Sequence, residues 1–78
     1  MIEPQLLAEI VRKHRKAAEL SQLQLSEMAG VGKTVVFDLE KGKATIRLDT
    51  VRKILSVLNI KVQFTSPLMK QILNDEKS

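Results

Sequence analysis

Two glycines, Gly30 and Gly42, limit the middle of this chain to one short element between two sharp stops. Glycine readily takes the left-handed conformation that ends a helix, so we expect a tight turn at each position. The element between them contains a Val-Val-Phe run at 35–37, which favours a strand and makes an edge strand the alternative. However, Val36 and Leu39 are three residues apart with charged residues on the other faces, and this spacing predicts a helix.

The preceding segment has the pattern of two helices. The first is expected over residues 4–19, with Pro4 in its first turn and apolar residues at helical spacing: Leu6, Leu7, Ile10, Val11, Ala17, Ala18 and Leu20. A second, shorter helix is expected over residues 22–29, because Ser21 and Gln24 fit a capping box. Its inward residues are predicted to be Leu25 and Met28, and Val31 fits the corner that follows.

A last helix of the bundle is predicted over residues 48–58. Asp49 lies in its first turn, where the helix dipole favours a negative charge, and Asn59 can end it in the left-handed conformation. The apolar stripe of this helix comprises Leu48, Val51, Ile54, Leu55 and Leu58.

The period then changes to alternation, because Ile60, Val62 and Phe64 alternate with polar residues. This pattern predicts a half-buried strand at residues 60–65. The chain offers no second strand to pair with it, and unpaired strand edges tend to recruit a partner. We therefore expect the same strand of a second copy to pair with it across a two-fold axis, which gives a homodimer.

Residues 66–78 are expected to form a short last helix and a frayed tail. The apolar residues of this segment either pack on the core or dock a partner, and the two alternatives are equally favoured: Leu68, Met69, Ile72 and Leu73.

The GVGKT stretch at residues 30–34 resembles the end of a phosphate-binding nucleotide loop. That loop needs a first glycine five residues before the second, which in this chain would be position 27. Glu27 occupies the position and places a carboxylate where phosphate oxygens would approach. The nucleotide-loop interpretation therefore fails.

The net charge of the chain indicates the kind of partner it binds. The chain has 78 residues, a formal charge of +4 and a sequence pI near 9.7. A basic balance favours an acidic partner such as nucleic acid, and two Phe with no Tyr or Trp disfavour base stacking on single strands. Without cysteine and with one histidine, His14, no metal or other cofactor is expected. No membrane segment or signal peptide is apparent, so we expect a cytoplasmic protein that does not bind membranes.

Two short helices joined by a glycine turn within a small basic bundle describe a helix-turn-helix. The stretch SQLQLSEMAGVGKTVVFDLEKGK resembles the Xre/Cro-type helix-turn-helix family. The matches cover a Ser cap, a Gln, the turn glycine, an inward valine and the Leu-Glu-x-Gly end, and the resemblance spans about residues 12–58. The following KATIRLDTVRKILSVLNIKVQF is similar, more loosely, to HipB-type antitoxins, in which a strand pairs across the dimer.

The resemblance implies a mainly all-α fold, a small four- to five-helix bundle of the lambda-repressor-like type, plus one C-terminal strand that pairs across a dimer. The expected organisation is a DNA-binding domain at 1–59, a dimerisation strand at 60–65 and a short helix or tail at 66–78.

The family resemblance also implies a role for individual side chains. The base-facing positions are Lys33, Thr34, Val35 and Asp38, and the phosphate-facing positions are Gln22, Lys41 and Lys43, with Lys13 or Lys16 beside them. Arg15 matches an arginine that the family pairs with the glutamate at Glu40, although both could be ordinary surface charges.

The leading hypothesis is a homodimeric repressor that binds a palindromic operator in double-stranded DNA. The HipB-like resemblance adds an antitoxin role, with a HipA-like toxin kinase as partner and autoregulation of the shared operon. The alternative is a protein-interaction module that keeps the fold without specific DNA binding. An enzyme is not expected, because Glu9, His14 and Glu19 are five residues apart and do not share a helix face.

Overall fold

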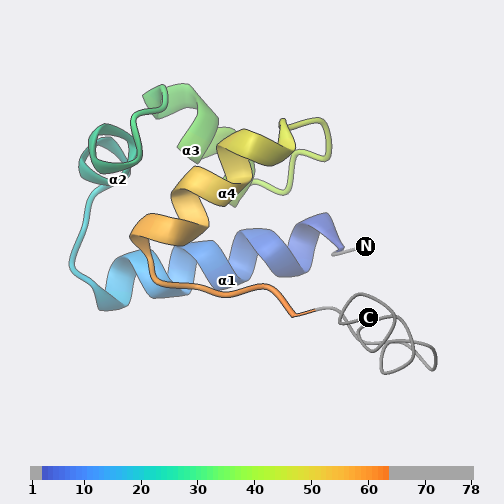
Figure 1. The fold of residues 1–78 in the computed structure, drawn as a ribbon, viewed down its shortest axis with the longest axis horizontal. Helices are drawn as coiled ribbons and strands as arrows, with labels where there is room; N and C mark the ends of the chain where they lie inside the picture. The colour runs from blue at the N-terminus through green and yellow to red at the C-terminus, as the bar shows by residue number, and fades with distance from the viewer. Residues whose placement is uncertain (1–2, 64–78) are drawn as a thin grey trace, which may run out of the picture.

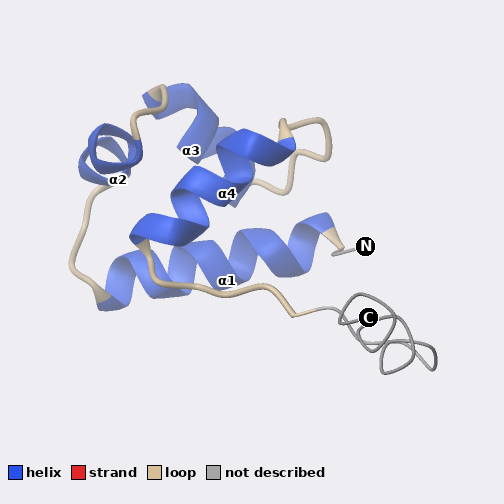
Figure 2. Cartoon of the chain, viewed as in Figure 1, coloured by secondary structure: helices blue, strands red, loops and turns tan. Residues whose placement is uncertain are grey.

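A computed structural model describes residues 3–63, which form four helices (Figures 1 and 2). They are α1 (Pro4–Ala17), α2 (Gln22–Ala29), α3 (Lys33–Glu40) and α4 (Leu48–Val57). This arrangement confirms the small all-α bundle, and it shows that the Val-Val-Phe run is helical despite its preference for strands. Among residues 3–63, no helix is long and apolar enough to cross a membrane.

The core forms where one face of each helix meets the others. The fully enclosed cluster comprises Val11, Leu25, Val36, Leu39, Ile54 and Leu55. Val31, in the turn between α2 and α3, packs against this cluster, as the sequence predicted. The α1–α3 and α2–α3 contacts place α3 against both earlier helices, while α4 packs mainly on α2.

Helix α1 begins as expected and ends two residues early. Pro4 occupies its first turn, and the Glu3 carboxylate accepts from the Gln5 and Leu6 amides at 3.0 Å. The prediction that the helix runs to residue 19 is wrong, because Glu19 takes a left-handed conformation with φ of 58°. Reversal of the chain there also leaves Ala17 and Ala18 exposed instead of on the packed stripe.

Both ends of α2 follow the sequence signals. Ser21 Oγ accepts from the Gln24 amide at 3.0 Å, and Gln24 Oε1 accepts from the Ser21 amide at 2.8 Å, which is the predicted capping box. Gly30 ends the helix with φ of 70°. Buried Ser26 donates its hydroxyl to the Leu23 carbonyl at 2.7 Å, so the hydroxyl keeps a partner inside the bundle.

Three further apolar residues that the periodicity placed on packed helix faces lie outside the core, and the first is Leu6 of α1, which is 52% exposed. Met28 is 60% exposed, because the packed face of α2 is centred on Gln22 and Ala29, roughly 110° around the helix from Met28 at 100° per residue. Leu48 is 75% exposed, because it is the first residue of α4 and lies nearly two turns before Ile54 and Leu55.

The end of α4 agrees with the prediction from the sequence. Asn59 has φ of 59° and its amide donates to the Ser56 carbonyl at 3.1 Å, after which the Ile60 amide donates to the Leu55 carbonyl at 2.9 Å. Residues 60–63 form no strand within the described chain, and Phe64 and Thr65 lie outside the described residues. The predicted helix and its apolar residues at 66–73 also lie outside them, so the dimer strand and the docking segment stay predictions.

Candidate nucleic-acid interface

The turn between α2 and α3 sets the angle at which α3 is presented. The Gly30 amide donates to the Glu27 carbonyl at 3.2 Å, and the Val31 amide donates to the Ser26 carbonyl at 3.0 Å. These bonds close the end of α2 while Val31 packs on the core. Gly32 then caps α3 in an extended conformation, without a side-chain hydrogen bond. GVGKT therefore forms a rigid corner followed by the first turn of a helix.

Helix α3 has one packed side and one exposed side. Val36, Leu39 and Glu40 are buried against the other helices, while Lys33, Thr34 and Phe37 are exposed. The first turn of α3 thus presents an amine and a hydroxyl to solvent, with backbone amides that lack partners within the helix. Such a turn can donate hydrogen bonds to base edges or phosphates.

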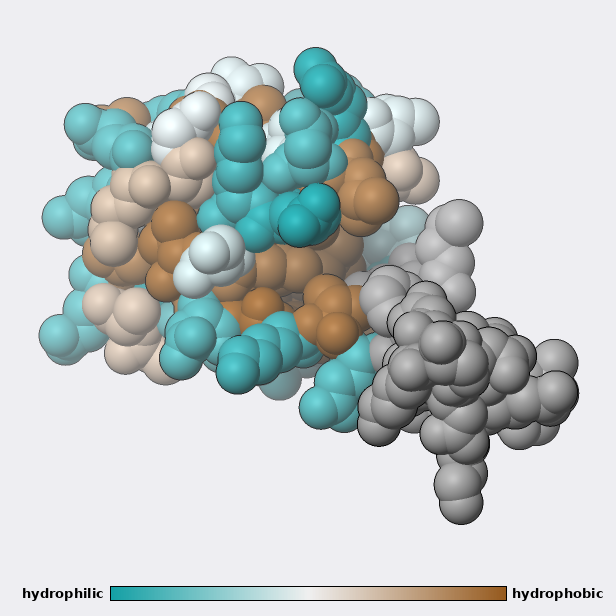
Figure 3. All heavy atoms as spheres, in the orientation of Figure 1, coloured by the Kyte–Doolittle hydropathy of each residue, from teal (hydrophilic) through white to brown (hydrophobic). Residues whose placement is uncertain are grey.

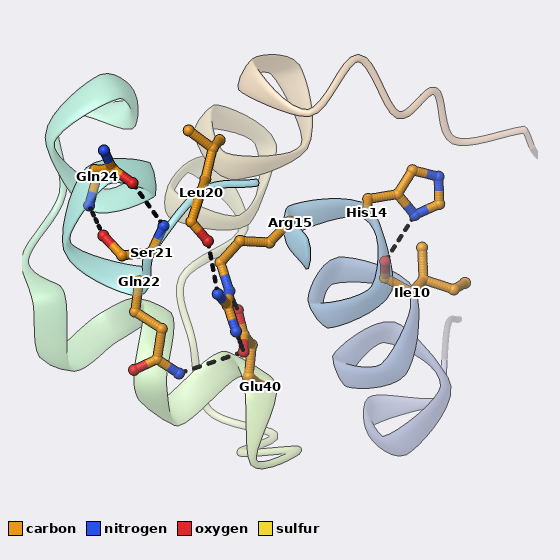
Figure 4. A network of polar contacts seen from close by, with 8 residues as sticks. All are labelled: Ile10, His14, Arg15, Leu20, Ser21, Gln22, Gln24 and Glu40. Atoms are coloured by element: carbon orange, nitrogen blue, oxygen red, sulfur yellow. Dashed lines mark hydrogen bonds and ion pairs between the residues drawn. The ribbon is translucent and has the colours of Figure 1, made fainter. Parts of the chain in front are cut away.

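Arg15 and Glu40 join α1 to the end of α3 (Figure 4). Arg15 Nε donates to Glu40 Oε2 at 2.6 Å, and Nη2 donates to Oε1 at 3.0 Å. The third guanidinium nitrogen, Nη1, donates to the Leu20 carbonyl at 2.8 Å. Only 11% of the Arg15 side chain and 4% of the Glu40 side chain are exposed, so this is a buried pair and not two ordinary surface charges. The hydrogen bonding that Arg15 donates to the Glu40 carboxylate raises the pKa of Arg15 above its usual value.

Gln22 points toward the same carboxylate. Its Nε2 lies 3.3 Å from Glu40 Oε1, and the side chain is half-buried (Figure 4). The first residue of α2 is therefore connected to α3 and, through Glu40, to α1. Sequence reasoning gave Gln22 a phosphate contact and missed this second partner, which is 18 residues away in the chain.

Asp38 faces the loop that follows α3. Its carboxylate lies 3.5 Å from Lys43 Nζ, and its carbonyl accepts from the Lys43 amide at 3.1 Å. The residue lines a shallow pocket of about 210 Å³ together with Val35, Thr45, Ile46, Arg47 and Thr50. Val35 is half-buried and packs against the core, so it has less free surface than Lys33 or Thr34.

The remaining predicted phosphate contacts are exposed lysines. On α1, Lys13 Nζ pairs with Glu9 at 2.8 Å and lowers the pKa of that carboxyl group, and Lys16 is exposed one turn after Arg12. Beyond α3, Lys41 lies with its Nζ 4.6 Å from the centroid of the Phe37 ring. Phe37 itself was missed as a surface residue, although its position four residues after Lys33 places it on the exposed side.

The three residues considered as an acid–base group have other partners. Glu9 pairs with Lys13, and His14 Nδ1 lies 2.7 Å from the Ile10 carbonyl of its own helix. Glu19 lies beyond the end of α1. Within residues 3–63, no hydrogen bond or ion pair connects these three side chains.

A short capped helix, a glycine corner and a second helix with an exposed basic first turn together define a helix-turn-helix DNA-binding domain. A helix-turn-helix family model matches residues 11–64, and the chain belongs to this family, of the Xre type. The family consists of DNA-binding transcriptional regulators.

Two curated proteins are similar to this chain over most of its length. An uncharacterized HTH-type transcriptional regulator, y4mF, of Sinorhizobium fredii is 34% identical over 64 residues, which cover 82% of this chain and 84% of that protein. The control protein C.SmaI of Serratia marcescens is 34% identical over 58 residues, which cover 74% of this chain and 69% of that protein.

Proposed function

We propose that this protein is a transcriptional repressor that binds a palindromic operator sequence-specifically. The exposed first turn of α3 carries the proposal, because Lys33 and Thr34 face solvent while Val36 and Leu39 fix the helix to the core. In helix-turn-helix proteins this end of the second helix enters the major groove. A lysine in this position donates hydrogen bonds to guanine O6 and N7. A threonine hydroxyl can either donate a hydrogen bond to a base edge or accept one from it. In this proposal Val35 and Asp38 complete the base-facing set.

Phosphate contacts supply most of the proposed affinity. Gln22 begins α2, whose free N-terminal amides favour an anion, and Lys41 and Lys43 follow α3 directly. Lys13 and Lys16 on α1 would extend the positive surface. Neutralising phosphates with lysine releases bound counterions, so binding should weaken steeply as salt is raised.

We propose that two copies act together, joined by paired strands at residues 60–65. Support comes from Val62, whose side chain is 41% exposed, and from Ile60, which packs on the core and ties the segment to α4. Phe64 would continue the same alternating face. Hydrophobic residues are also gathered across the middle of the face that carries α4 (Figure 3), which gives a dimer apolar surface to cover.

The antitoxin role is a further part of the proposal. It rests on the similarity of residues 43–64 to HipB-type antitoxins, and it assigns a HipA-like kinase as the protein partner. The apolar residues proposed to dock that kinase are Leu68, Met69, Ile72 and Leu73. Repression would then act on the operon that encodes both proteins. As a repressor of a bacterial type of operon, the protein would act in the cytoplasm, where that DNA lies.

The competing function is a protein-interaction module that neutralises its partner without specific DNA binding. The exposed first turn of α3 favours the repressor, because its lysine can pair with DNA phosphates or base edges, whereas docking of an apolar surface does not require a positive charge there. Salt separates the two functions, since DNA binding weakens steeply with added salt and apolar docking does not.

Selection from a pool of random duplexes tests the repressor proposal even though the operator sequence is unknown. We expect enrichment of a palindrome whose half-sites are about one helical turn apart, which is the spacing for a dimer on one face of DNA. The same selection with Lys33→Ala should lose preference at one or more positions of each half-site. A pool that stays random with the wild-type protein would contradict the proposal.

A further inference from the structure

Phe37 is the large apolar side chain on the outer side of α3. It is 44% exposed, although Val36 before it and Leu39 after it are buried. A single exposed apolar side chain is normal on a protein surface, so the residues around Phe37 decide whether it has a role. The residue lies one turn after Lys33 and one turn before Lys41, so the three side chains form a stripe along the free side of α3.

The charges around Phe37 indicate which partner fits. Lys41 is an exposed residue whose Nζ lies over the Phe37 ring, 4.6 Å from the centroid, in a cation–π contact. Lys33 is also exposed at the other end of the stripe. An apolar partner would have to cover these two amines without neutralising them, whereas duplex DNA offers phosphates to the amines and apolar groups on the groove floor.

We propose that Phe37 is a specificity-determining residue that packs against the C5-methyl group of a pyrimidine in the major groove. Lys41, oriented by the Phe37 ring, then contacts the neighbouring phosphate. The apolar group that the major groove presents is the thymine methyl, and phenylalanine is one of the side chains suited to it. A 5-methylcytosine offers the same group in the same groove. This inference rests on the proposed repressor function.

Phe37 suits this contact better than Val35. The Val35 side chain is half-buried, packs against the core and faces the pocket beside Asp38. Val35 therefore offers less free surface to a base than Phe37 does. Phe37 needs no such rearrangement, because its ring already lies on the exposed side between the two lysines.

The test is a methyl scan of the duplex selected by the wild-type protein. Each thymine of a half-site is replaced in turn by uracil, which removes one methyl group, and each cytosine by 5-methylcytosine, which adds one. Binding is measured by fluorescence anisotropy for wild type, Phe37→Ala and Phe37→Leu. Met28→Ala is the matched control, because Met28 is also an exposed apolar residue but lines the groove between α2 and α4.

We expect wild type to lose roughly fourfold in affinity at one thymine or more, the equivalent of about 0.8 kcal/mol for one buried methyl-sized group. A roughly fourfold gain at a cytosine would instead identify 5-methylcytosine as the preferred source of the methyl. Phe37→Ala should bind the changed and unchanged duplexes alike, whereas Phe37→Leu should keep part of the difference. Met28→Ala should behave as wild type.

Two results would overturn the inference alone. In the first, wild type prefers the selected duplex but is insensitive to every methyl change. In the second, Phe37→Ala keeps the full methyl dependence of wild type. Wild type that binds every duplex equally would overturn the repressor function itself, so the two failures are distinguishable. Circular dichroism of Phe37→Ala should match wild type, because the side chain lies outside the core cluster.

Discussion

Arg15 in the last turn of α1 holds Glu40, the last residue of α3, through two hydrogen bonds of 2.6 and 3.0 Å. The carboxylate also accepts from Gln22 at the start of α2. One buried glutamate therefore links the three helices that carry the proposed DNA contacts. The link ties the C-terminal end of α3 to α1 and α2, while Val36 and Leu39 pack α3 into the core.

Removal of the Glu40 carboxylate should strongly destabilise the fold. Glu40→Ala leaves the Arg15 guanidinium buried without its partner, which should lower the free energy of unfolding by about 3 to 5 kcal/mol. In a domain of this size, the melting temperature should fall by more than about 10 °C. Thermal melts followed by circular dichroism measure the change. The double variant Arg15→Met/Glu40→Leu, which removes both charges, should recover most of the loss, and a single variant that melts within a few degrees of wild type would refute a stabilising buried pair.

Gln22→Ala should weaken DNA binding evenly. The variant loses one hydrogen bond to Glu40 and the proposed phosphate contact, so affinity should fall roughly fivefold, or about 1 kcal/mol, for every duplex. The slope of affinity against salt should not change, because glutamine carries no charge. Gln24→Ala is the control, since it breaks the capping box at the same helix end. If Gln24→Ala weakened binding as much, general fraying of α2 would explain both results.

Asp38→Asn should strengthen binding to DNA of unrelated sequence. The change removes a carboxylate near the proposed phosphate path and frees Lys43, which lies 3.5 Å from it. The log-log salt slope should therefore become steeper by about one, the contribution of one additional lysine–phosphate contact. Titrations at four salt concentrations measure the slope. An unchanged slope would show that Asp38 does not keep Lys43 from a phosphate.

The two glycines of the turn should respond in opposite directions. Gly30 has φ of 70°, so Gly30→Ala should destabilise the fold by about 1 to 2 kcal/mol even though no atom lies within 4 Å of the added Cβ. Gly32 has an ordinary φ of −71° and lacks a side-chain cap, so Gly32→Ser should stabilise by a few tenths of a kcal/mol. Urea titrations resolve both. Equal effects at the two positions would show that backbone conformation does not control this turn.

The dimer proposal predicts a particle of twice the 8.8 kDa chain mass at micromolar concentration. Val62→Glu would place a charge on the proposed strand face and should give the monomer, whereas Lys61→Glu, on the alternate face, should remain dimeric. Light scattering after size exclusion gives the masses. A wild-type protein with the monomer mass would contradict paired strands.

Local signals in the sequence predicted both ends of α2 and the end of α4, although the end of α1 was placed two residues too late. Ser21 with Gln24, Gly30 and Asn59 each mark a terminus through their own backbone chemistry, which needs no distant partner. The exposure of Met28 and Leu48 was not predictable in this way, because helical spacing defines a stripe but not which part of it a neighbouring helix covers. The Arg15–Glu40 pair was expected only from the family resemblance. Its third member, Gln22, and the exposed ring of Phe37 depend on the packing of three helices.

The central claim is that the first turn of α3 recognises a DNA sequence. Fluorescence anisotropy of wild type and Lys33→Ala, against the duplex upstream of the gene and a scrambled duplex at two salt concentrations, tests it most directly. We predict salt-sensitive binding that prefers the upstream duplex, and a loss of about 1 to 3 kcal/mol of that preference in Lys33→Ala. Weak and equal binding of wild type to both duplexes would contradict the claim and favour the protein-interaction module.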